Sequence, residues 1–214
     1  MIGAAILAQS KSSHRWLREH FSDEYVIRSR EEGYRSRACY KLMELDDKYN
    51  LIKPGMQVVD LGAAPGGWSQ VAVQRVGKSG RVVASDILEM EPIEGVHFLT
   101  GDFTQDRVYQ DLCRLLGDQG ADLVISDMAP NLSGVKGVDQ PRLMSLVELA
   151  LDFALGALQR GGSFVTKIFH GEGFDEFVKL CRQHFDQVRI YKPKSSRSRS
   201  SEVYVVATGF KKSD

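Results

Sequence analysis

The sequence predicts an α/β fold in which a mostly parallel sheet carries helices on both faces. Short apolar runs alternate with longer amphipathic segments, as in a chain of βαβ units. A glycine-rich loop follows the first apolar run, and charged side chains recur where the runs end. The 214 residues suit a single domain with a sizeable core. Within it, residues 1–50 are expected to form a basic arm and helices that contribute to the active site, and residues 51–214 a ligand-binding core.

Each predicted element is a short segment with one hydrophobic period. The expected strands are 57–61, 81–86, 96–100, 122–127, 163–169, 187–191 and 202–208, with the last two as an antiparallel pair. The expected helices are 67–75, 105–116, 141–158 and 174–184. Pro141 suits the first turn of its helix, where a missing N–H costs nothing. Gly161 and Gly162 are expected to end the preceding element, so that the next strand begins after them.

Charged side chains stand at the ends of the predicted parallel strands. They are Asp60, Asp86, Asp102, Asp127 and Lys167. Right-handed crossovers bring the loops after parallel strands to one edge of the sheet, where ligands bind in open α/β folds. Helix N-capping would explain one or two of the carboxylates but not the whole set. The sequence therefore predicts a ligand site at this edge.

The loop after the first strand, DLGAAPGGW at 60–68, is suited to a nucleoside ligand without phosphates. Its glycines allow a backbone to turn closely around a ligand, but the pattern is not GxGxxG, and Pro65 removes an amide donor. Asp86 is placed to accept hydrogen bonds from ribose hydroxyls, which NAD and S-adenosylmethionine share. Asp102 is placed to accept from an adenine amino group. Trp68 either packs beside the ligand or is a core aromatic.

Lys167 is the candidate proton acceptor, because it lies in the otherwise apolar strand SFVTKIF. Burial lowers the pKa of a lysine, and a neutral amine can accept a proton from a hydroxyl group. A lysine that reaches from the strand end into solvent would have no such role. The strand alone leaves both interpretations open.

The charge and cysteine patterns narrow the class of protein. Net charge is zero, yet basic residues gather between residues 11 and 41 and again from residue 189 onward, so one face can attract a polyanion. The three cysteines and five histidines lack metal-ligand spacing, and we expect no metal. No apolar run reaches the ~20 residues of a membrane span, and a cytoplasmic location is expected.

Four segments, in this order, carry a family resemblance: DLGAAPGGWSQ from 60, SDMAPNLSG at 126–134, GSFVTKIFHGEGFDE at 162–176 and SSRSRSSEVYVVATG at 195–209. With SSHRWLREHFSDEYV at 12–26, they resemble the bacterial FtsJ/RrmJ family of 23S ribosomal RNA (uridine-2′-O-)-methyltransferases. The resemblance implies a Rossmann-like, seven-stranded S-adenosylmethionine-dependent methyltransferase fold. It implies S-adenosylmethionine as the methyl donor and a uridine 2′-hydroxyl of 23S rRNA as the acceptor. The cofactor residues it implies are Gly66, Trp68, Asp86, Asp102 and Asp127.

The resemblance also implies a catalytic tetrad formed by Lys41, Asp127, Lys167 and Glu202, with Lys167 as the proton acceptor. Two positive and two negative groups would satisfy one another in a shielded pocket and hold the ribose. A neighbouring carboxylate raises the pKa of a lysine, whereas burial and nearby positive charge lower it. The sequence does not decide which effect is larger, so the role of Lys167 as a base is a hypothesis.

The basic residues that flank this tetrad are the candidate RNA contacts. They are Arg35 and Arg37 near Lys41, and Lys194, Arg197 and Arg199 near Glu202, with Tyr204 expected to pack near the acceptor ribose or base. Specificity for one ribose has to come from RNA shape and flanking contacts. The partner implied by the family is 23S rRNA in the large (50S) ribosomal subunit, bound by a monomer.

Three alternatives remain beside this interpretation. A nicotinamide-dependent oxidoreductase is disfavoured by the GAAPGG loop and the two lysines. A methyltransferase acting on tRNA or another RNA, such as an mRNA cap, would use the same chemistry. A ribosome-assembly factor without catalysis would have no need of the tetrad.

Overall fold

The computed structural model describes residues 23–130 and 133–212; the predicted arm up to residue 22 and the loop positions 131–132 lie outside the described residues. The chain forms one seven-stranded sheet in the order β3-β2-β1-β4-β5-β7-β6. The strands are β1 (Gln57–Leu61), β2 (Arg81–Asp86), β3 (Val96–Thr100), β4 (Ala121–Ser126), β5 (Leu158–Phe169), β6 (Phe185–Tyr191) and β7 (Glu202–Phe210). The predicted seven-stranded, Rossmann-like sheet is confirmed.

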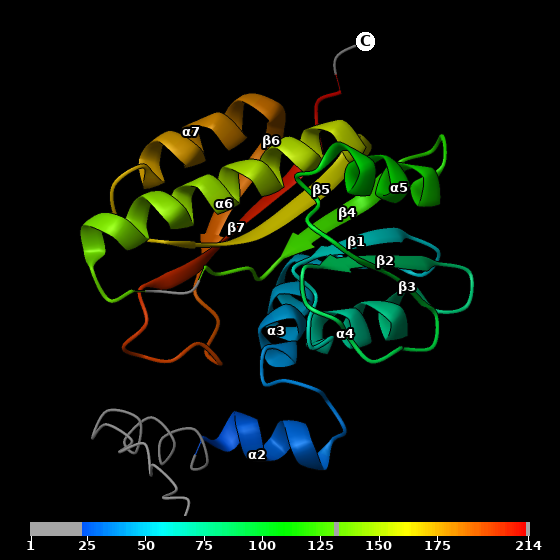
Figure 1. Cartoon of the computed structure of the whole chain (residues 1–214), viewed down its shortest axis with the longest axis horizontal. Helices are drawn as coiled ribbons and strands as arrows, with labels where there is room; N and C mark the ends of the chain where they lie inside the picture. Colours follow the sequence, from blue (N-terminus) through cyan, green and yellow to red (C-terminus); the bar gives the residue numbers. More distant parts are fainter. Residues whose placement is uncertain (1–22, 131–132, 213–214) are drawn as a thin grey trace, which may run out of the picture.

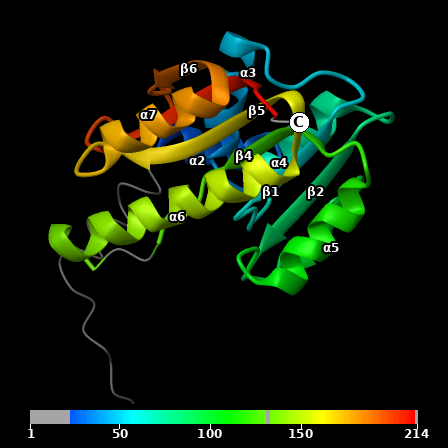
Figure 2. The ribbon, with the colours of Figure 1, turned by 90° about the horizontal axis from the view of Figure 1, so that it is seen from above.

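Helices cover both faces of the sheet (Figures 1 and 2). One face carries α5 (Asp106–Leu116), α6 (Lys136–Ala157) and α7 (Phe174–His184). The other carries α3 (Cys39–Tyr49) and α4 (Gly67–Val76), with α2 (Glu24–Glu31) beyond them, away from the sheet (Figure 1). The molecule is therefore a three-layer sandwich, with the N-terminal helices on the α4 side.

The two cores follow from the alternation of side chains along each strand. Val58 of β1 packs with the α3 and α4 side chains, whereas its neighbour Val59 packs with those of α5 and α6. In β7, Tyr204 faces the first core and Val205 the second. Because both faces are covered, the central strands are almost continuously apolar, as the sequence predicts.

Strand direction sets where the polar strand ends meet. β1 pairs in parallel with β2 and β4, and β4 pairs in parallel with β5. β7 runs antiparallel to both β5 and β6, so the expected antiparallel β6–β7 pair is confirmed. The carboxyl ends of β1, β2, β4 and β5 thus share one edge with the start of β7. The strand order reverses between β1 and β4, which is where such folds bind ligands.

Two local expectations are wrong. α6 begins at Lys136, so Pro141 lies inside the helix and not in its first turn. The earlier start is stabilised by Asp139, whose carboxylate accepts hydrogen bonds from the backbone N–H groups of Ser133 (2.8 Å) and Gly134 (2.9 Å).

The glycine pair that was expected to precede the strand lies inside β5. The pairing of β4 with β5 shifts register here: Ala121 lies opposite Leu158, but Leu123 lies opposite Ser163. Gly161 has φ of +80°, a backbone conformation that favours glycine. The glycines therefore form a bulge within a longer strand.

Leu151 of α6 tests the packing of this face against the sheet. Its side chain is 1% exposed within the core shared by α6 and the sheet. We expect Leu151→Ala to lower the free energy of unfolding by about 2–5 kcal/mol, because a buried cavity replaces the removed atoms. Urea denaturation measures the change. Leu149→Ala is the matched control on the same helix, since Leu149 is 42% exposed; equal losses in the two variants would contradict the packing described.

Candidate active site

The loop after β1 is a tight backbone turn, and at two of its positions the backbone conformation and the close neighbours require glycine. Gly62 has φ of +72°, and a Cβ there would overlap the side chain of Met128. Gly66 has φ of +110° where α4 begins, and a Cβ there would lie 2.7 Å from Cδ1 of Ile93. The loop backbone is therefore held between the segment after β4 and the β2–β3 connection.

Asp86 and Asp102 both lie at the predicted edge and both also brace the local backbone. Asp86 accepts hydrogen bonds from the backbone N–H groups of Ala64 through Oδ2 and of Leu88 through Oδ1, each at 2.9 Å. Asp102 Oδ1 accepts from the backbone N–H (2.9 Å) and hydroxyl (2.7 Å) of Thr104. A carboxylate has further lone pairs, so these bonds leave each group able to accept hydrogen bonds from a ligand.

The two carboxylates line a cavity of about 830 Å³ at the carboxyl edge of the sheet. Asp127 also lines it, and Arg142 is the one basic residue among its described lining side chains. The apolar side chains of Ile87 and Leu88 stand in its wall, 71% and 63% exposed. The excess of carboxylates suits a cationic ligand and disfavours a pyrophosphate. The volume of the cavity and its mixture of polar and apolar side chains fit a nucleoside cofactor that carries a positive charge. S-adenosylmethionine is such a cofactor.

Trp68 and Gly66 do not line this cavity in the structure. The indole of Trp68 is 3% exposed, donates from Nε1 to the carbonyl of Ala38 (2.8 Å), and lies 5.7 Å from the ring of Tyr204. Of its two expected roles, the structure shows the core aromatic. A part for either residue in holding the cofactor stays a prediction.

The four residues of the predicted tetrad meet beside the cavity. Lys41 comes from α3, Asp127 follows β4, Lys167 lies in β5 and Glu202 begins β7. Lys167 Nζ lies 3.2 Å from Asp127 Oδ1 and donates to the backbone carbonyl of Asp127 at 2.6 Å. Lys41 Nζ lies 2.8 Å from Glu202 Oε1 and 3.9 Å from Asp127 Oδ1. Segments about 160 residues apart thus form one cluster of two cations and two anions.

The cluster keeps its carboxylates ionised although they are largely shielded from solvent. Burial alone would raise the pKa of Asp127, but Lys167, Lys41 and the hydroxyl of Tyr204 outweigh it and hold that pKa below its usual value. Burial likewise opposes the ionisation of Glu202, and the ammonium of Lys41 lowers its pKa. Both lysines are themselves less than a tenth exposed. The site is therefore a shielded group of paired charges.

Tyr204, expected to pack near the acceptor, lies inside the protein beside Asp127, and its contact with the acceptor stays a prediction. Its side chain is fully buried, and its hydroxyl donates to Asp127 Oδ1 at 2.5 Å. Burial, and then the nearby carboxylates, raise the pKa of Tyr204 well above its usual value, so the phenol stays protonated and remains a donor. The residue supports Asp127 from inside the protein. The alternation Glu202, Tyr204 on one face of β7, with Tyr204 opposite Lys167, is the signal that could have shown this.

Arg35 and Arg37, predicted to contact RNA, bind other parts of the protein. The guanidinium of Arg35 donates to the carbonyls of Pro65 (3.2 Å), Glu91 (2.5 Å) and Pro92 (2.8 Å). It thereby fastens the glycine-rich loop to the β2–β3 connection. Arg37 is hydrogen-bonded to the carboxylate of Asp23 and the carbonyl of Ser195. Both arginines are partly exposed, so their contact with RNA stays a prediction beside these internal bonds.

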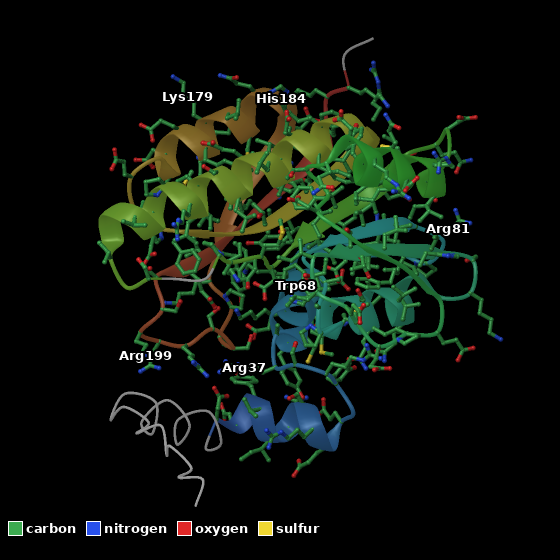
Figure 3. The ribbon with its side chains drawn as sticks, in the orientation of Figure 1. Arg37, Trp68, Arg81, Lys179, His184 and Arg199 are labelled. Carbon is green, nitrogen blue, oxygen red and sulfur yellow. The ribbon has the colours of Figure 1, made fainter. Side chains whose placement is uncertain are left out.

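The other predicted RNA contacts lie on the β6–β7 connection, residues 192–201. Lys194 and Arg199 are exposed, and Arg197 lies with Nε 3.6 Å from Asp23 Oδ2. Figure 3 shows Arg199 on this connection, on the same side of the sheet as Arg37 and α2. Contact of these residues with RNA stays a prediction.

Within residues 23–130 and 133–212, no cluster of three or more His, Cys, Asp or Glu side chains could hold a metal ion. No helix there is both long and apolar enough to cross a bilayer.

The fold, the carboxylate-lined cavity and the tight glycine loop define a Rossmann-like protein with a site for a nucleoside cofactor. The model of the FtsJ-like methyltransferase family matches residues 34–210. The chain belongs to this family, as the sequence motifs predict.

Proteins named Ribosomal RNA large subunit methyltransferase E are similar over nearly the whole chain. The one from Cellvibrio japonicus is 62% identical, over 95% of this chain and 97% of its own. The one from Pseudomonas aeruginosa (strain PAO1) is 57% identical, over 96% and 99%.

Solved structures show the same architecture. A ribosomal RNA methyltransferase from Plasmodium falciparum is 31% identical with a TM-score of 0.76, covering 83% of this chain and 98% of its own. A SAM-dependent O-methyltransferase from Thermotoga maritima shares the fold at 16% identity, with a TM-score of 0.55 and coverage of 81% and 66%.

Asp60, at the end of β1, is a buried carboxyl group beneath the site. It is 2% exposed and accepts a hydrogen bond from the hydroxyl of Ser69 at 2.7 Å. Burial raises its pKa to about 7 from the usual 3.8, and the charges of Asp127 and Asp86 add to the effect. The protonated form is therefore the one that the fold favours.

This shift predicts a stability that falls as pH rises. A group whose folded pKa is raised stabilises the fold fully below its unfolded pKa, and the contribution is lost as pH rises through about 7. Relative to Asp60→Asn, which does not titrate, the wild-type free energy of unfolding should fall by about 2 kcal/mol between about pH 5 and pH 7. Urea titrations of both proteins across this range measure it, and parallel pH profiles would contradict a raised pKa.

Proposed function

We propose that this protein transfers a methyl group from S-adenosylmethionine to the ribose 2′-hydroxyl of a uridine in 23S rRNA, acting as a cytoplasmic monomer on the large ribosomal subunit. One observation carries the proposal: Asp127 belongs to the charged cluster and also lines the carboxylate-rich cavity. A cofactor in the cavity and a hydroxyl at the cluster would then be neighbours. Placing two reactants side by side supplies much of the rate of such a transfer.

Asp86 and Asp102 would hold the nucleoside part of the cofactor, and Asp127 would face its positively charged part. When bound, S-adenosylmethionine supplies an activated methyl group on a sulfonium. The protein then has to orient the acceptor oxygen and remove its proton.

Lys167 is proposed to take that proton. In this proposal Lys167, which is paired as a cation in the cluster, first releases its own proton to solvent; its Nζ then accepts the proton of the ribose hydroxyl and becomes an ammonium ion again. The ammonium is stabilised where it forms, because Asp127 Oδ1 lies 3.2 Å away and the carbonyl of Asp127 2.6 Å away. Lys41, held by Glu202, is placed to donate a hydrogen bond to the ribose. The cluster thus supplies one proton acceptor and one fixed donor.

The names of the similar proteins support 23S rRNA as the acceptor. Those named above carry the name of a large-subunit ribosomal RNA methyltransferase and match this chain over nearly its whole length. Transfer to tRNA or to another RNA would use the same cluster, and an assembly factor would bind the subunit without transfer. An experiment distinguishes these two alternatives from the proposed function.

The experiment is transfer of tritiated methyl groups to large ribosomal subunits that lack the modification, followed by mapping of the labelled nucleotide. Label on the ribose of a 23S rRNA uridine supports the proposal. Label on tRNA or free RNA but not on subunits would overturn the substrate. Cofactor binding without label on any RNA would favour the assembly factor.

The assigned proton acceptor gives a specific prediction for Lys167→Met. We expect the single-turnover rate of methyl transfer to fall by at least about a hundredfold, since general-base catalysis contributes on that order. Cofactor affinity, measured by isothermal titration calorimetry, should change little.

The matched control is Lys179→Met, an exposed lysine on α7 on the far side of the sheet from Arg37 (Figure 3). It should leave both values unchanged. Nearly full turnover in Lys167→Met would show that the proton goes elsewhere.

A further inference from the structure

A second cavity, of about 630 Å³, opens beside α3 and is separate from the cofactor cavity in its described lining. We call it the tyrosine groove. It lies between α2, α3 and the end of β6. Its lining residues are Tyr25, Arg28, Tyr40, Met43, Glu44, Asp47, Lys48, Tyr191 and Lys194. None of these belongs to the catalytic cluster or to the carboxylate-lined cavity, and Lys194 alone is among the predicted RNA contacts.

Aromatic rings form much of its wall. Tyr25 and Tyr40 lie with their centroids 5.4 Å apart, and Tyr191 packs edge-on against Tyr49 at 5.9 Å. Tyr40 is buried, whereas Tyr25 and Tyr191 are partly exposed. The groove therefore presents two accessible rings that are supported from behind by others. Rigid, partly exposed aromatic rings are what unpaired nucleobases stack on.

Cations accompany the rings. Lys48 Nζ lies 5.1 Å from the centre of the Tyr191 ring, and the guanidinium of Arg28 lies 4.7 Å from that of Tyr40. Lys194 is exposed at the rim. Such groups suit a ligand with both flat rings and negative charge.

The acidic residues of the groove are bound to partners of this chain. Glu44 accepts hydrogen bonds from the backbone N–H groups of Lys194 (2.7 Å) and Ser195 (2.8 Å). Asp47 pairs with Arg75 at 2.8 Å. These contacts offset their charge, so the groove does not repel a phosphate as strongly as its composition suggests.

Two segments of the chain contribute both to the groove and to the catalytic cluster. Tyr40 in its wall is the neighbour of Lys41 along α3. The β6–β7 connection carries Lys194 at the groove and leads to Glu202 at the cluster. Glu44 fastens that connection to α3 where the two segments meet. A strand of RNA that places a ribose at Lys41 would thus pass along this wall.

We propose that the tyrosine groove binds an unpaired nucleobase of the RNA that flanks the methylated ribose, by stacking on Tyr25 and Tyr191 with Lys48 and Lys194 near the phosphates. The inference rests on the proposed function for its acceptor, and it adds a binding site for the substrate outside the cofactor cavity. It also assigns α2, which lies away from the sheet, a role in recognition (Figure 1).

Tyr191→Ala and Tyr25→Ala test the stacking, each beside its phenylalanine variant, which keeps the ring. The alanine variants should raise the KM for large subunits lacking the modification by about tenfold, because stacking of one base contributes on that order. The phenylalanine variants should stay near wild type. Cofactor affinity should be the same in all of them. Unchanged KM in both alanine variants would overturn the proposal.

Lys48→Ala tests the charge without removing a ring, and Lys179→Ala on α7 is its control, because both lysines are exposed. Only Lys48→Ala should raise the KM and weaken its dependence on salt. An equal effect in the two variants would contradict a local site.

Ultraviolet crosslinking of wild-type protein to the same subunits, read by mass spectrometry, tests the contact directly. The expected product is a nucleotide adduct on Tyr25 or Tyr191. Crosslinks from these tyrosines only to ribosomal proteins, or only from tyrosines elsewhere, would overturn it. Failure of the proposed function gives a different result, since wild-type protein would then label no 23S rRNA whatever the groove variants do.

Discussion

The site depends on one partly buried carboxylate, that of Asp127. Asp127 accepts a hydrogen bond from the phenol of Tyr204, lies within ion-pair distance of Lys167 and Lys41, and lines the cofactor cavity. A buried anion is costly unless it is paired, so its position fixes those of both lysines. Lys41 in turn is held by Glu202. The charged cluster and the carboxylate-lined cavity are therefore joined at a single residue.

The sheet makes this arrangement possible. Parallel β4 and β5 bring Asp127 and Lys167 to the same edge, and the reversal of β7 starts Glu202 at that edge as well. The positions of the strands along the chain, the parallel core and the polar strand ends could be predicted because hydrophobic period and turn residues are local signals. The bulge at Gly161 and the early start of α6 could not, because each depends on a partner elsewhere in the chain: the register of β4 and the carboxylate of Asp139.

The candidate site was predictable to a similar extent. The motifs identified the four charged residues, and the structure brings them together. The contacts that individual side chains make were harder to predict from the sequence. Arg35, expected to contact RNA, binds three carbonyl groups of the chain, and Tyr204, expected near the acceptor, donates to Asp127 from inside the protein; the sequence indicated neither bond. Whether an arginine or a tyrosine faces solvent is decided by packing between distant segments, on which the sequence pattern carries no information.

The central claim is that the charged cluster acts as one unit. A double-mutant cycle on Lys41→Met and Glu202→Gln tests it most directly, with the single-turnover rate of methyl transfer as the readout. These two side chains meet at 2.8 Å. The account predicts that the double variant is about as slow as the slower single variant, because either change already breaks the unit. Losses that multiply in the double variant would show that the two residues act independently and would contradict the claim.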